Sequence, residues 1–174
     1  EKCPQLIVVQ PRFEEYVQNS RAFIRILKEV APVVEQASID EAYCDMSGTR
    51  RIYGDPVALA HRLKDRIRDE LHFTVNVGIS DCKLLAKMAS DFEKPDRVHT
   101  LFLDEIKEKM WPLPAGELFL VGRSSEKKLK SLGIRTIGDI ASMDRGLLQL
   151  HFGRQGSTMW EFANGIDPSP VRAH

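Results

Sequence analysis

The sequence has no excess of charge of either sign: Lys and Arg number 25, and Asp and Glu also number 25, among its 174 residues. Proteins that bind nucleic acid over a broad surface usually carry a clear basic excess. The balance therefore excludes a chain that is basic throughout, and any contact with nucleic acid must come from a local cluster of cations. Long apolar runs are missing as well. No stretch approaches the roughly 20 residues of a transmembrane helix, and no signal peptide is visible, so we predict no membrane partner.

Cysteine is scarce, and its positions exclude two further classes of protein. Cys3, Cys44 and Cys82 are odd in number and far apart, so they form neither a disulfide framework nor a pair with metal-ligand spacing. This pattern favours a reducing compartment, and we predict a cytoplasmic protein. The histidines show no metal-ligand spacing, and no Ser–His–Asp or Cys–His triad is evident. We also expect a piece of a longer protein, because the chain begins at Glu1 and stops soon after Pro170.

Apolar residues make up 43% of the chain, enough for a substantial core. In the first hundred residues the periodicity predicts a strand at Leu6–Val9, a helix from Phe13 to Val30, a hairpin over Val33–Met46, a helix from Asp55-Pro56 to Leu71, a strand at Phe73–Ile79, a short helix around Leu84–Ala89 capped by Ser80 or Asp81, and a strand at Val98–Phe102. This order favours an α+β fold in which helices cover one face of a mainly antiparallel sheet. The other face is left open for a substrate.

After Leu103 no further strand is convincing, and short helical patterns follow one another. They cover Asp104–Trp111, Ser124–Leu132, Ile137–Ala141, Arg145–Phe152 and Gln155–Asn164. We therefore predict a boundary between residues 103 and 104, with a small all-helical module over residues 104–174. Trp111 and Trp160 are expected to anchor the core of this module.

An acidic pair, Asp40-Glu41, lies near the bend of the predicted hairpin, and Asp45 adds a third carboxylate five positions after Asp40. Neighbouring side chains of a flat strand point to opposite faces, so the pair can converge on one ion only if the chain turns there. Such a turn suits a divalent-metal site for phosphate chemistry, because magnesium prefers one or two carboxylates together with substrate phosphates. The alternative is a solvated hairpin tip, since acidic residues are common in turns.

The stretch from Gly122 to Arg135 is locally basic, with five cations and one anion. Gly122 precedes a helix whose first turn offers Ser124 and Ser125, and the backbone N–H groups of such a turn can hold a phosphate. Arg123 and Lys128 add charge for contacts with a nucleic-acid backbone that do not depend on sequence. The alternative is a solvated cationic helix face. A second turn, Gly133–Ile140, is better explained as a plain connector between packed helices.

Three lysines lie on or just after the short helix that follows the strand at Phe73–Ile79. Lys83 and Lys87 are one turn apart and share a face, and Lys94 precedes Pro95 in an extended segment. Lysines held near an acidic metal site suit a nucleoside triphosphate, although the spacing alone favours ordinary surface lysines. Gly78, inside the preceding strand, suggests a close approach of backbone.

Taken together, these segments resemble the Y-family, or translesion, DNA polymerases, also called the ImpB/MucB/SamB group, and in particular their bacterial polymerase IV branch. The motifs that carry the resemblance are Ser38–Asp45 for S-x-D-E-A, Val77–Ser80 with Lys83–Ser90 for G-I-(x)n-K-x-x-A-K-x-A-S, Lys94-Pro95 for K-P, Leu132–Asp139 for the thumb signature, and Gly165–Asp167 for the end of the thumb. Five motifs in this order are far more specific than any one of them.

The resemblance implies that residues 1–103 are an incomplete palm and residues 104–174 a thumb with helix-hairpin-helix character. Asp40 and Glu41 would be two of three catalytic carboxylates that hold two Mg²⁺ ions, Lys94 would contact the incoming deoxynucleoside triphosphate, and the turn at Gly122 would hold primer–template DNA. A sliding clamp is implied as a partner of the full-length protein.

The sequence also departs from the family pattern. The first metal-binding Asp, the fingers and the little finger of the family lie outside it, so we expect magnesium to bind, and synthesis to occur, only in the complete protein. Leu120-Val121-Gly122 has one glycine where the family usually has two, and Cys82-Lys83 stands where Asn-Lys is usual. Two alternatives stay open: a palm-fold nucleotide cyclase, and a non-catalytic helix-hairpin-helix DNA-binding protein with a degenerate palm.

Overall fold

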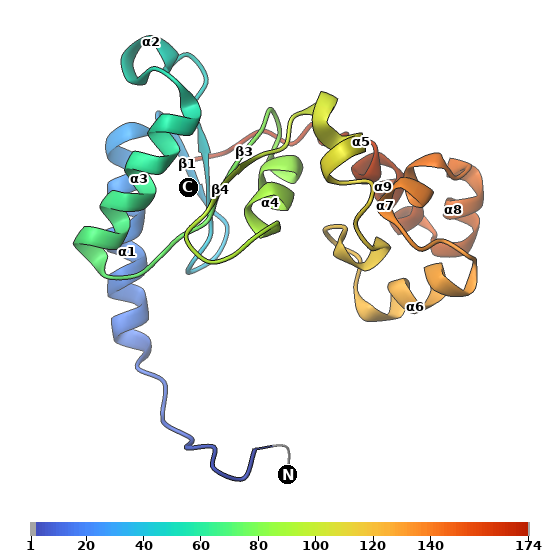
Figure 1. Cartoon of the computed structure of the whole chain (residues 1–174), viewed down its shortest axis with the longest axis horizontal. Helices are drawn as coiled ribbons and strands as arrows, with labels where there is room; N and C mark the ends of the chain where they lie inside the picture. The colour runs from blue at the N-terminus through green and yellow to red at the C-terminus, as the bar shows by residue number, and fades with distance from the viewer. Residues whose placement is uncertain (1–2, 174) are drawn as a thin grey trace.

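The computed structural model describes residues 3–173 and divides into a sheet lobe and a helical module (Figure 1). The sheet lobe contains α1 (Phe13–Val30), β1 (Val33–Gln36), β2 (Ala42–Asp45), α2 (Arg50–Tyr53), α3 (Pro56–Leu71), β3 (Val77–Ile79), α4 (Lys83–Asp91) and β4 (Val98–Thr100). The helical module contains η1 (Leu103–Glu105), α5 (Ile106–Lys109), η2 (Ala115–Glu117), α6 (Arg123–Ser131), α7 (Ile137–Ser142), α8 (Arg145–Phe152) and α9 (Arg154–Ala163). The predicted α+β class, with a helical second part, is confirmed.

Local side-chain chemistry explains where several helices begin. Asp55 accepts a hydrogen bond from the Ala58 amide at 2.8 Å, and Pro56 occupies the first helical position of α3. Thr136 caps α7 in the same way, and the carboxylate of Asp139 accepts from the Thr136 amide at 2.9 Å. This reciprocal pair is a capping box. The predicted starts of both helices are therefore confirmed within a residue.

The strands form two short ladders rather than one mainly antiparallel sheet. β1 and β2 pair antiparallel, with Val33 opposite Asp45 and Gln36 opposite Ala42. β3 and β4 pair parallel, with Val77 opposite Val98. The parallel pair arises because α4 connects the two strands, and a crossover helix returns the chain in the same direction. The antiparallel prediction therefore describes only the hairpin.

The predicted buried strand at Leu6–Val9 is wrong. In the structure this run is neither a strand nor buried, since Ile7 and Val8 are 83% and 86% exposed. The first half of α1 shares this exposure, for example at Phe13, and both segments project away from the rest of the chain in Figure 1. An apolar run becomes a strand only where a partner strand pairs with it, and no other strand in residues 3–173 pairs with this run. Periodicity alone carries no information about that partner.

Two apolar cores hold the chain together. The first lies among α1, β1 and α3 and includes Phe23, Leu27, Val34 and Ile67. The second joins α4 to the whole helical module, so that Leu84, Leu85, Met88 and Ala89 share one cluster with Met110, Leu129, Ile137, Leu148 and Met159. Trp111 and Trp160 pack against this second core and donate hydrogen bonds to Ala163 O and Met143 O, as expected of core anchors. Helix α4 is therefore the element common to the two parts of the molecule.

The start of α4 is capped from a distant part of the chain. Cys82 occupies the N-cap position, but its side chain does not cap the helix, and the Leu84 amide instead donates to Asp167 Oδ2 at 3.0 Å. The prediction of a cap by Ser80 or Asp81 is wrong, because the Ser80 hydroxyl donates to Leu101 O. After Asp167 the chain runs back from the helical module to β1 (Figure 1), where the Arg172 amide donates to Glu35 at 2.7 Å. This return segment connects the two parts.

Substitution Asp167→Ala is expected to lower the free energy of unfolding by about 1 kcal/mol, a typical cost for a lost N-cap. Urea denaturation of the chain measures the change. Asp81→Ala is the matched control, because Asp81 is exposed beside the same helix start and does not cap it, and its expected effect is below about 0.5 kcal/mol. Equal losses for the two variants would contradict the assignment.

No helix within residues 3–173 combines the length and the apolar composition needed to cross a bilayer.

Candidate active site

The acidic pair lies at the bend between β1 and β2, as the sequence predicted. The amides of Ala37 and Ser38 both donate to the carbonyl of Glu41, at 2.9 and 3.1 Å, and close the loop of the hairpin. The hydroxyl of Ser38 sits inside this bend and accepts from the amides of Asp40 and Glu41 at 3.3 and 3.1 Å. A serine at the start of a turn thus fixes the backbone of both acidic residues.

The two carboxylates are exposed and have different partners. Asp40 Oδ1 accepts from the Ser38 hydroxyl at 2.6 Å, whereas Glu41 Oε1 accepts from Lys87 Nζ at 2.7 Å. No helix of the described chain covers them, so both oxygen pairs are accessible to solvent or to a ligand. The bend therefore presents two adjacent carboxylates on a fixed backbone, one of them neutralised by a lysine.

Asp45, the third carboxylate of the octet, does not join this pair. It lies opposite Val33 at the far end of the ladder, and its Oδ1 accepts from the Ser47 amide at 2.9 Å. The hydrogen bonds from Ser47 lower the pKa of Asp45. In residues 3–173 no three His, Cys, Asp or Glu side chains are grouped to hold a metal ion. Two carboxylates at one bend still fit magnesium, which commonly takes one or two carboxylates and completes its shell with water and phosphate oxygens.

Helix α4 directs two lysines toward the hairpin. Lys83 Nζ donates to Glu35 Oε1 at 2.6 Å and lies 4.9 Å from the centre of the Tyr43 ring. Lys87, one turn later, donates to Glu41. The predicted common face of these lysines is confirmed, and that face meets the acidic side of the hairpin. They are therefore engaged with carboxylates of the hairpin rather than being ordinary surface lysines.

A chain of alternating charges runs from the bend to Lys94. Lys87 pairs with Glu41 and also with Asp91 at 3.0 Å, and Asp91 pairs in turn with Lys94 at 2.8 Å. Burial acts to raise the pKa of Asp91, but the hydrogen bonds from Lys94 and Lys87 outweigh it and the pKa is lowered. Burial likewise acts to lower the pKa of Lys87, which is raised by Glu41 and Asp91. Both groups are therefore charged at neutral pH.

Gly78 allows α4 to lie directly on β3. A Cβ atom at this position would fall 1.8 Å from Ala86 O and 2.7 Å from Ser90 N. The close approach that the sequence suggested is thereby confirmed. It brings Lys83 and Lys87 within reach of the hairpin, because only a strand without a side chain at this point lets the helix come so near.

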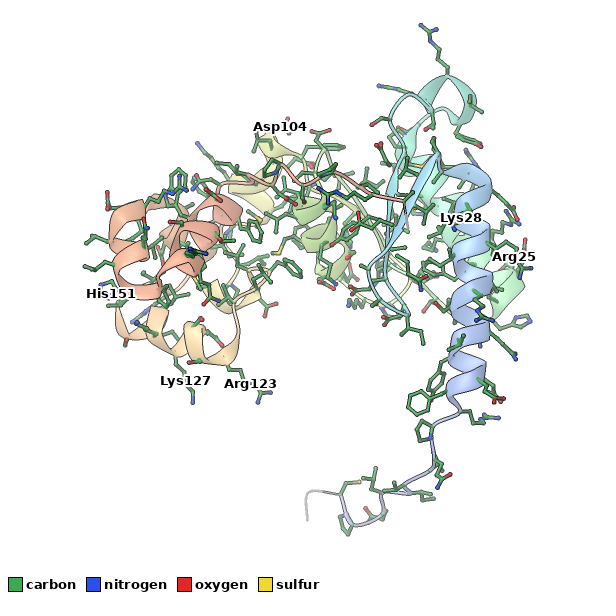
Figure 2. All side chains as sticks on the ribbon, turned by 180° about the vertical axis from the view of Figure 1, so that it is seen from behind. Arg25, Lys28, Asp104, Arg123, Lys127 and His151 are labelled. Atoms are coloured by element: carbon green, nitrogen blue, oxygen red, sulfur yellow. The ribbon has the colours of Figure 1, made fainter. Side chains whose placement is uncertain are left out.

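The helical module presents the predicted phosphate-binding turn on its outer surface. Gly122 is the N-cap of α6, no side chain caps it, and Arg123 and Ser124 are exposed. Figure 2 shows Arg123 and Lys127 projecting away from the module. Lys128 points elsewhere: its ammonium donates to His151 O and lies 4.9 Å from the Phe152 ring centre. The start of α6 thus has the open amides and nearby cations that an anion requires, with Lys128 directed toward α8.

The second turn, Gly133–Ile140, is held inside the module. The Ile137 and Gly138 amides donate to Leu113 O and Trp111 O, and Ile134 and Ile137 are buried. These contacts agree with the expected connector between packed helices.

Asp91 and Ser38 belong to the site but were not predicted from the sequence as functional. Ser38 stands two residues before Asp40, where a turn-forming hydroxyl is common. Asp91 follows Lys87 by four residues and precedes Lys94 by three, the spacings at which side chains meet on a helix. Helical spacing could therefore have identified Asp91.

Comparisons with known proteins agree with this geometry. The sequence profile of the impB/mucB/samB family matches residues 1–91, and the profile of the DNA polymerase-iota thumb domain matches residues 117–167. A DNA polymerase IV of Clostridium acetobutylicum is 48% identical over 170 residues, which are 98% of this chain and 43% of that protein. DNA polymerase IV 2 of Bacillus subtilis is 40% identical over 174 residues, 42% of its length. The chain therefore spans less than half of the curated relatives it matches.

Solved structures of DNA polymerases are also similar to this chain. The crystal structure of DinB from Sulfolobus solfataricus superimposes with a TM-score of 0.86 and 28% identity, covering 97% of this chain and 50% of that one. An insertion ternary complex of Dbh DNA polymerase superimposes with a TM-score of 0.84 and 29% identity over 97% of this chain and 50% of that one.

Proposed function

Because the chain belongs to the impB/mucB/samB family, we propose that it provides most of the palm and the thumb of a polymerase that copies DNA past damaged bases. In this proposal residues 1–103 are the palm part and residues 104–174 the thumb. The bend with its two exposed carboxylates is the single observation that most supports it, since nucleotidyl transfer needs a fixed acidic pair open to metal and phosphate.

Asp40 and Glu41 would hold magnesium in the complete protein. Bound magnesium lowers the pKa of the attacking 3′-hydroxyl and neutralises charge on the phosphates. The backbone of both residues is already fixed by Ser38, so the bend itself would need little reorganisation to take up the ion. Lys87 would neutralise Glu41 until the ion binds, and would then keep its pair with Asp91.

Lys94 would contact the triphosphate of the incoming nucleotide. Its side chain is 60% exposed, and its ammonium pairs with Asp91 at 2.8 Å. Lys94 is therefore connected to the acidic bend through the charge chain Glu41–Lys87–Asp91–Lys94. Positive charge at this point would hold the triphosphate in the ground state and in the transition state alike.

The start of α6 would hold the backbone of primer–template DNA. Amides of the first turn, with Arg123, Ser124 and Ser125, would contact phosphate oxygens, and the turn at Gly122 would set their direction. We include Lys128 as a longer-range cation, which would have to leave His151 to touch phosphate directly. Such contacts would not depend on base sequence, as suits a polymerase that moves along its template.

The remaining partners follow from the same proposal. Deoxynucleoside triphosphates and primer–template DNA are the substrates, and a sliding clamp would bind the full-length protein. Cys3, Cys44 and Cys82 are all unpaired thiols, in keeping with a cytoplasmic location.

Primer extension tests the proposal. We expect the full-length polymerase that contains this chain to add nucleotides as the template directs, and only with a divalent cation present. The 174-residue chain alone is expected to give no extension, because within residues 3–173 no third metal-ligating side chain joins the two carboxylates. Template-independent formation of a cyclic nucleotide would favour the cyclase alternative. Salt-dependent DNA binding without any extension by the full-length protein would favour the non-catalytic alternative.

A further inference from the structure

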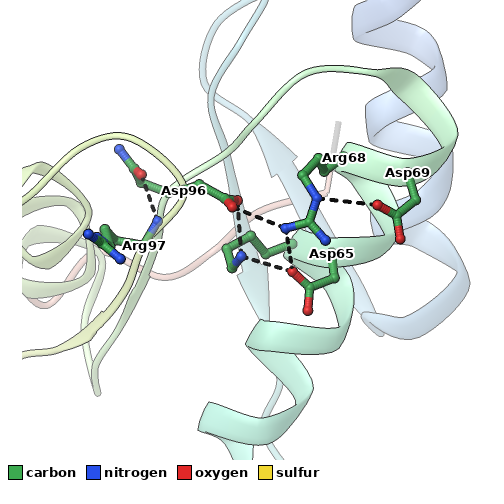
Figure 3. Close-up of polar contacts among 7 residues, drawn as sticks. Asp65, Arg68, Asp69, Asp96 and Arg97 are labelled. Atoms are coloured by element: carbon green, nitrogen blue, oxygen red, sulfur yellow. Dashed lines mark hydrogen bonds and ion pairs between the residues drawn. The ribbon is translucent and has the colours of Figure 1, made fainter.

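Asp96 lies in the loop between α4 and β4, two residues after Lys94, and both of its carboxylate oxygens are paired with cations on α3. Lys64 Nζ lies 3.0 Å from Asp96 Oδ1, and Arg68 Nη1 lies 3.1 Å from Asp96 Oδ2 (Figure 3). Helix α3 contributes nothing else to the site described above. The loop of Lys94 is therefore attached to a helix from a different core.

The attachment is unusual because one of its cations is buried. The Lys64 side chain is only 7% exposed, and its ammonium is shared between Asp96 and Asp65. Without Asp96 this buried ammonium would keep only one carboxylate partner, Asp65, and removing a partner from a buried charge is costly. Lys64 therefore favours any loop conformation that keeps Asp96 in contact.

The backbone at Asp96 is in the left-handed region, with a φ of +61°. Asp adopts this conformation more readily than most residues that have a side chain, so an Asp suits this turn of the loop. The next residue is fixed as well, since the Arg97 amide donates to Asn76 Oδ1 at 3.1 Å and the Arg97 carbonyl accepts from the Val77 amide at 2.9 Å. The contacts of Asp96 with α3 and the hydrogen bonds of Arg97 with residues 76 and 77 thus fix the position of the end of the loop.

The side chain of Lys94 itself is held less firmly than that of Asp96. Its side chain is 60% exposed, and its ion pair with Asp91 lies at the surface, where such pairs contribute little. The position of its Cα is thus set by the two ends of the loop, α4 on one side and Asp96 on the other.

We propose that Asp96 is a positioning residue for nucleotide binding: held by Lys64 and Arg68, it fixes the loop so that Lys94 stays beside Asp91, at the end of the charge chain that begins at Glu41. The inference rests on the proposed role of Lys94 and extends it to three residues that touch neither metal nor nucleotide. Asp96→Asn keeps the shape of the side chain and removes the one charge that pairs with both cations from the loop of Lys94.

Hydrogen–deuterium exchange of the chain tests the structural half. In Asp96→Asn the amides of Glu93, Lys94, residue 96 and Arg97 are expected to exchange at least about fivefold faster, because local opening becomes easier. Asp69→Asn is the matched control: Asp69 also pairs with Arg68, at 3.2 Å, but lies on α3 itself and does not reach the loop. Unchanged exchange in Asp96→Asn, or an equal increase in both variants, would overturn the proposal.

Steady-state kinetics of the full-length polymerase tests the functional half. Asp96→Asn is expected to raise the KM for the nucleotide about tenfold with kcat within about twofold, since it weakens binding in the ground and transition states alike. In a Lys94→Ala background the same substitution should have almost no further effect, as coupled residues are not additive. A full additional increase there would show that Asp96 acts elsewhere.

The two kinds of failure are distinguishable. If the unsubstituted full-length protein does not extend a primer, the proposed function fails. If it extends normally and Lys94→Ala leaves the nucleotide KM unchanged, the role of Lys94 fails and the positioning role of Asp96 falls with it, whatever the exchange data show about the loop.

Discussion

Substitution Asp40→Ala in the full-length polymerase is expected to abolish nucleotide addition while primer–template binding stays within about twofold of the original. Asp40 is exposed at the bend between β1 and β2, in the sheet lobe, whereas the α6 turn that would hold DNA belongs to the helical module. A metal ligand contributes several kcal/mol of charge stabilisation in the transition state, so its loss should reduce the rate of single-nucleotide addition by about 10³-fold or more. Rapid-quench primer extension and fluorescence anisotropy measure the two quantities.

Asp45→Ala is the matched control for this experiment. Asp45 belongs to the same acidic octet, but it lies at the opposite end of the ladder beside Val33. We expect less than about a threefold change in rate, as for a substitution away from the reacting atoms. Normal synthesis by Asp40→Ala, or equal losses in both variants, would refute the assignment of Asp40.

The second large effect is expected at Gly78. Substitution Gly78→Ala places a Cβ 1.8 Å from Ala86 O, a backbone atom of α4 that cannot move without displacing the helix. Overpacking usually costs about 1–3 kcal/mol and occasionally more, and we expect a loss of unfolding free energy at the upper end or above, about 3 kcal/mol. Urea denaturation of the chain measures it.

Gly122→Ala provides the comparison, because no atom lies within 4 Å of the added Cβ and the φ of −82° suits any residue. Its expected cost is below about 1 kcal/mol. If Gly78→Ala were no more destabilising than Gly122→Ala, α4 would have to sit farther from β3 than the structure places it. The lysines of α4 would then not reach the hairpin.

The sequence predicted well whatever is decided by neighbours along the chain. Asp55-Pro56 marks a helix start because Asp55 can cap the helix and proline suits its first position. The amide that Asp55 caps is only three residues away, at Ala58, and the structure has this cap. The bend at Asp40-Glu41 was predicted for the same reason, since a turn is set by a few consecutive residues. Gly78 was informative because a glycine inside a strand needs an explanation.

Contacts between residues that are far apart in the sequence could not be predicted from local patterns. The cap of α4 comes from Asp167, 83 residues after Leu84 and separated from it by the whole helical module. Lys87 and Glu41 are 46 residues apart, and nothing in the spacing of either indicates the other. The prediction of a strand at Leu6–Val9 is wrong for a similar reason, because the pairing of a strand depends on a second segment rather than on local composition.

The core shared by α4 and the helical module bears on how such proteins can be recombined. Chimaeras between relatives are often joined at an apparent border between parts, and residue 103 is the natural choice here. A junction at that point would match Leu84, Leu85 and Met88 from one parent with Met110 and Leu129 from another, and interiors tolerate mismatched volumes poorly. A crossover just before α4, in residues 80–82, would inherit this interior intact, although it would divide the β3–β4 ladder between the parents.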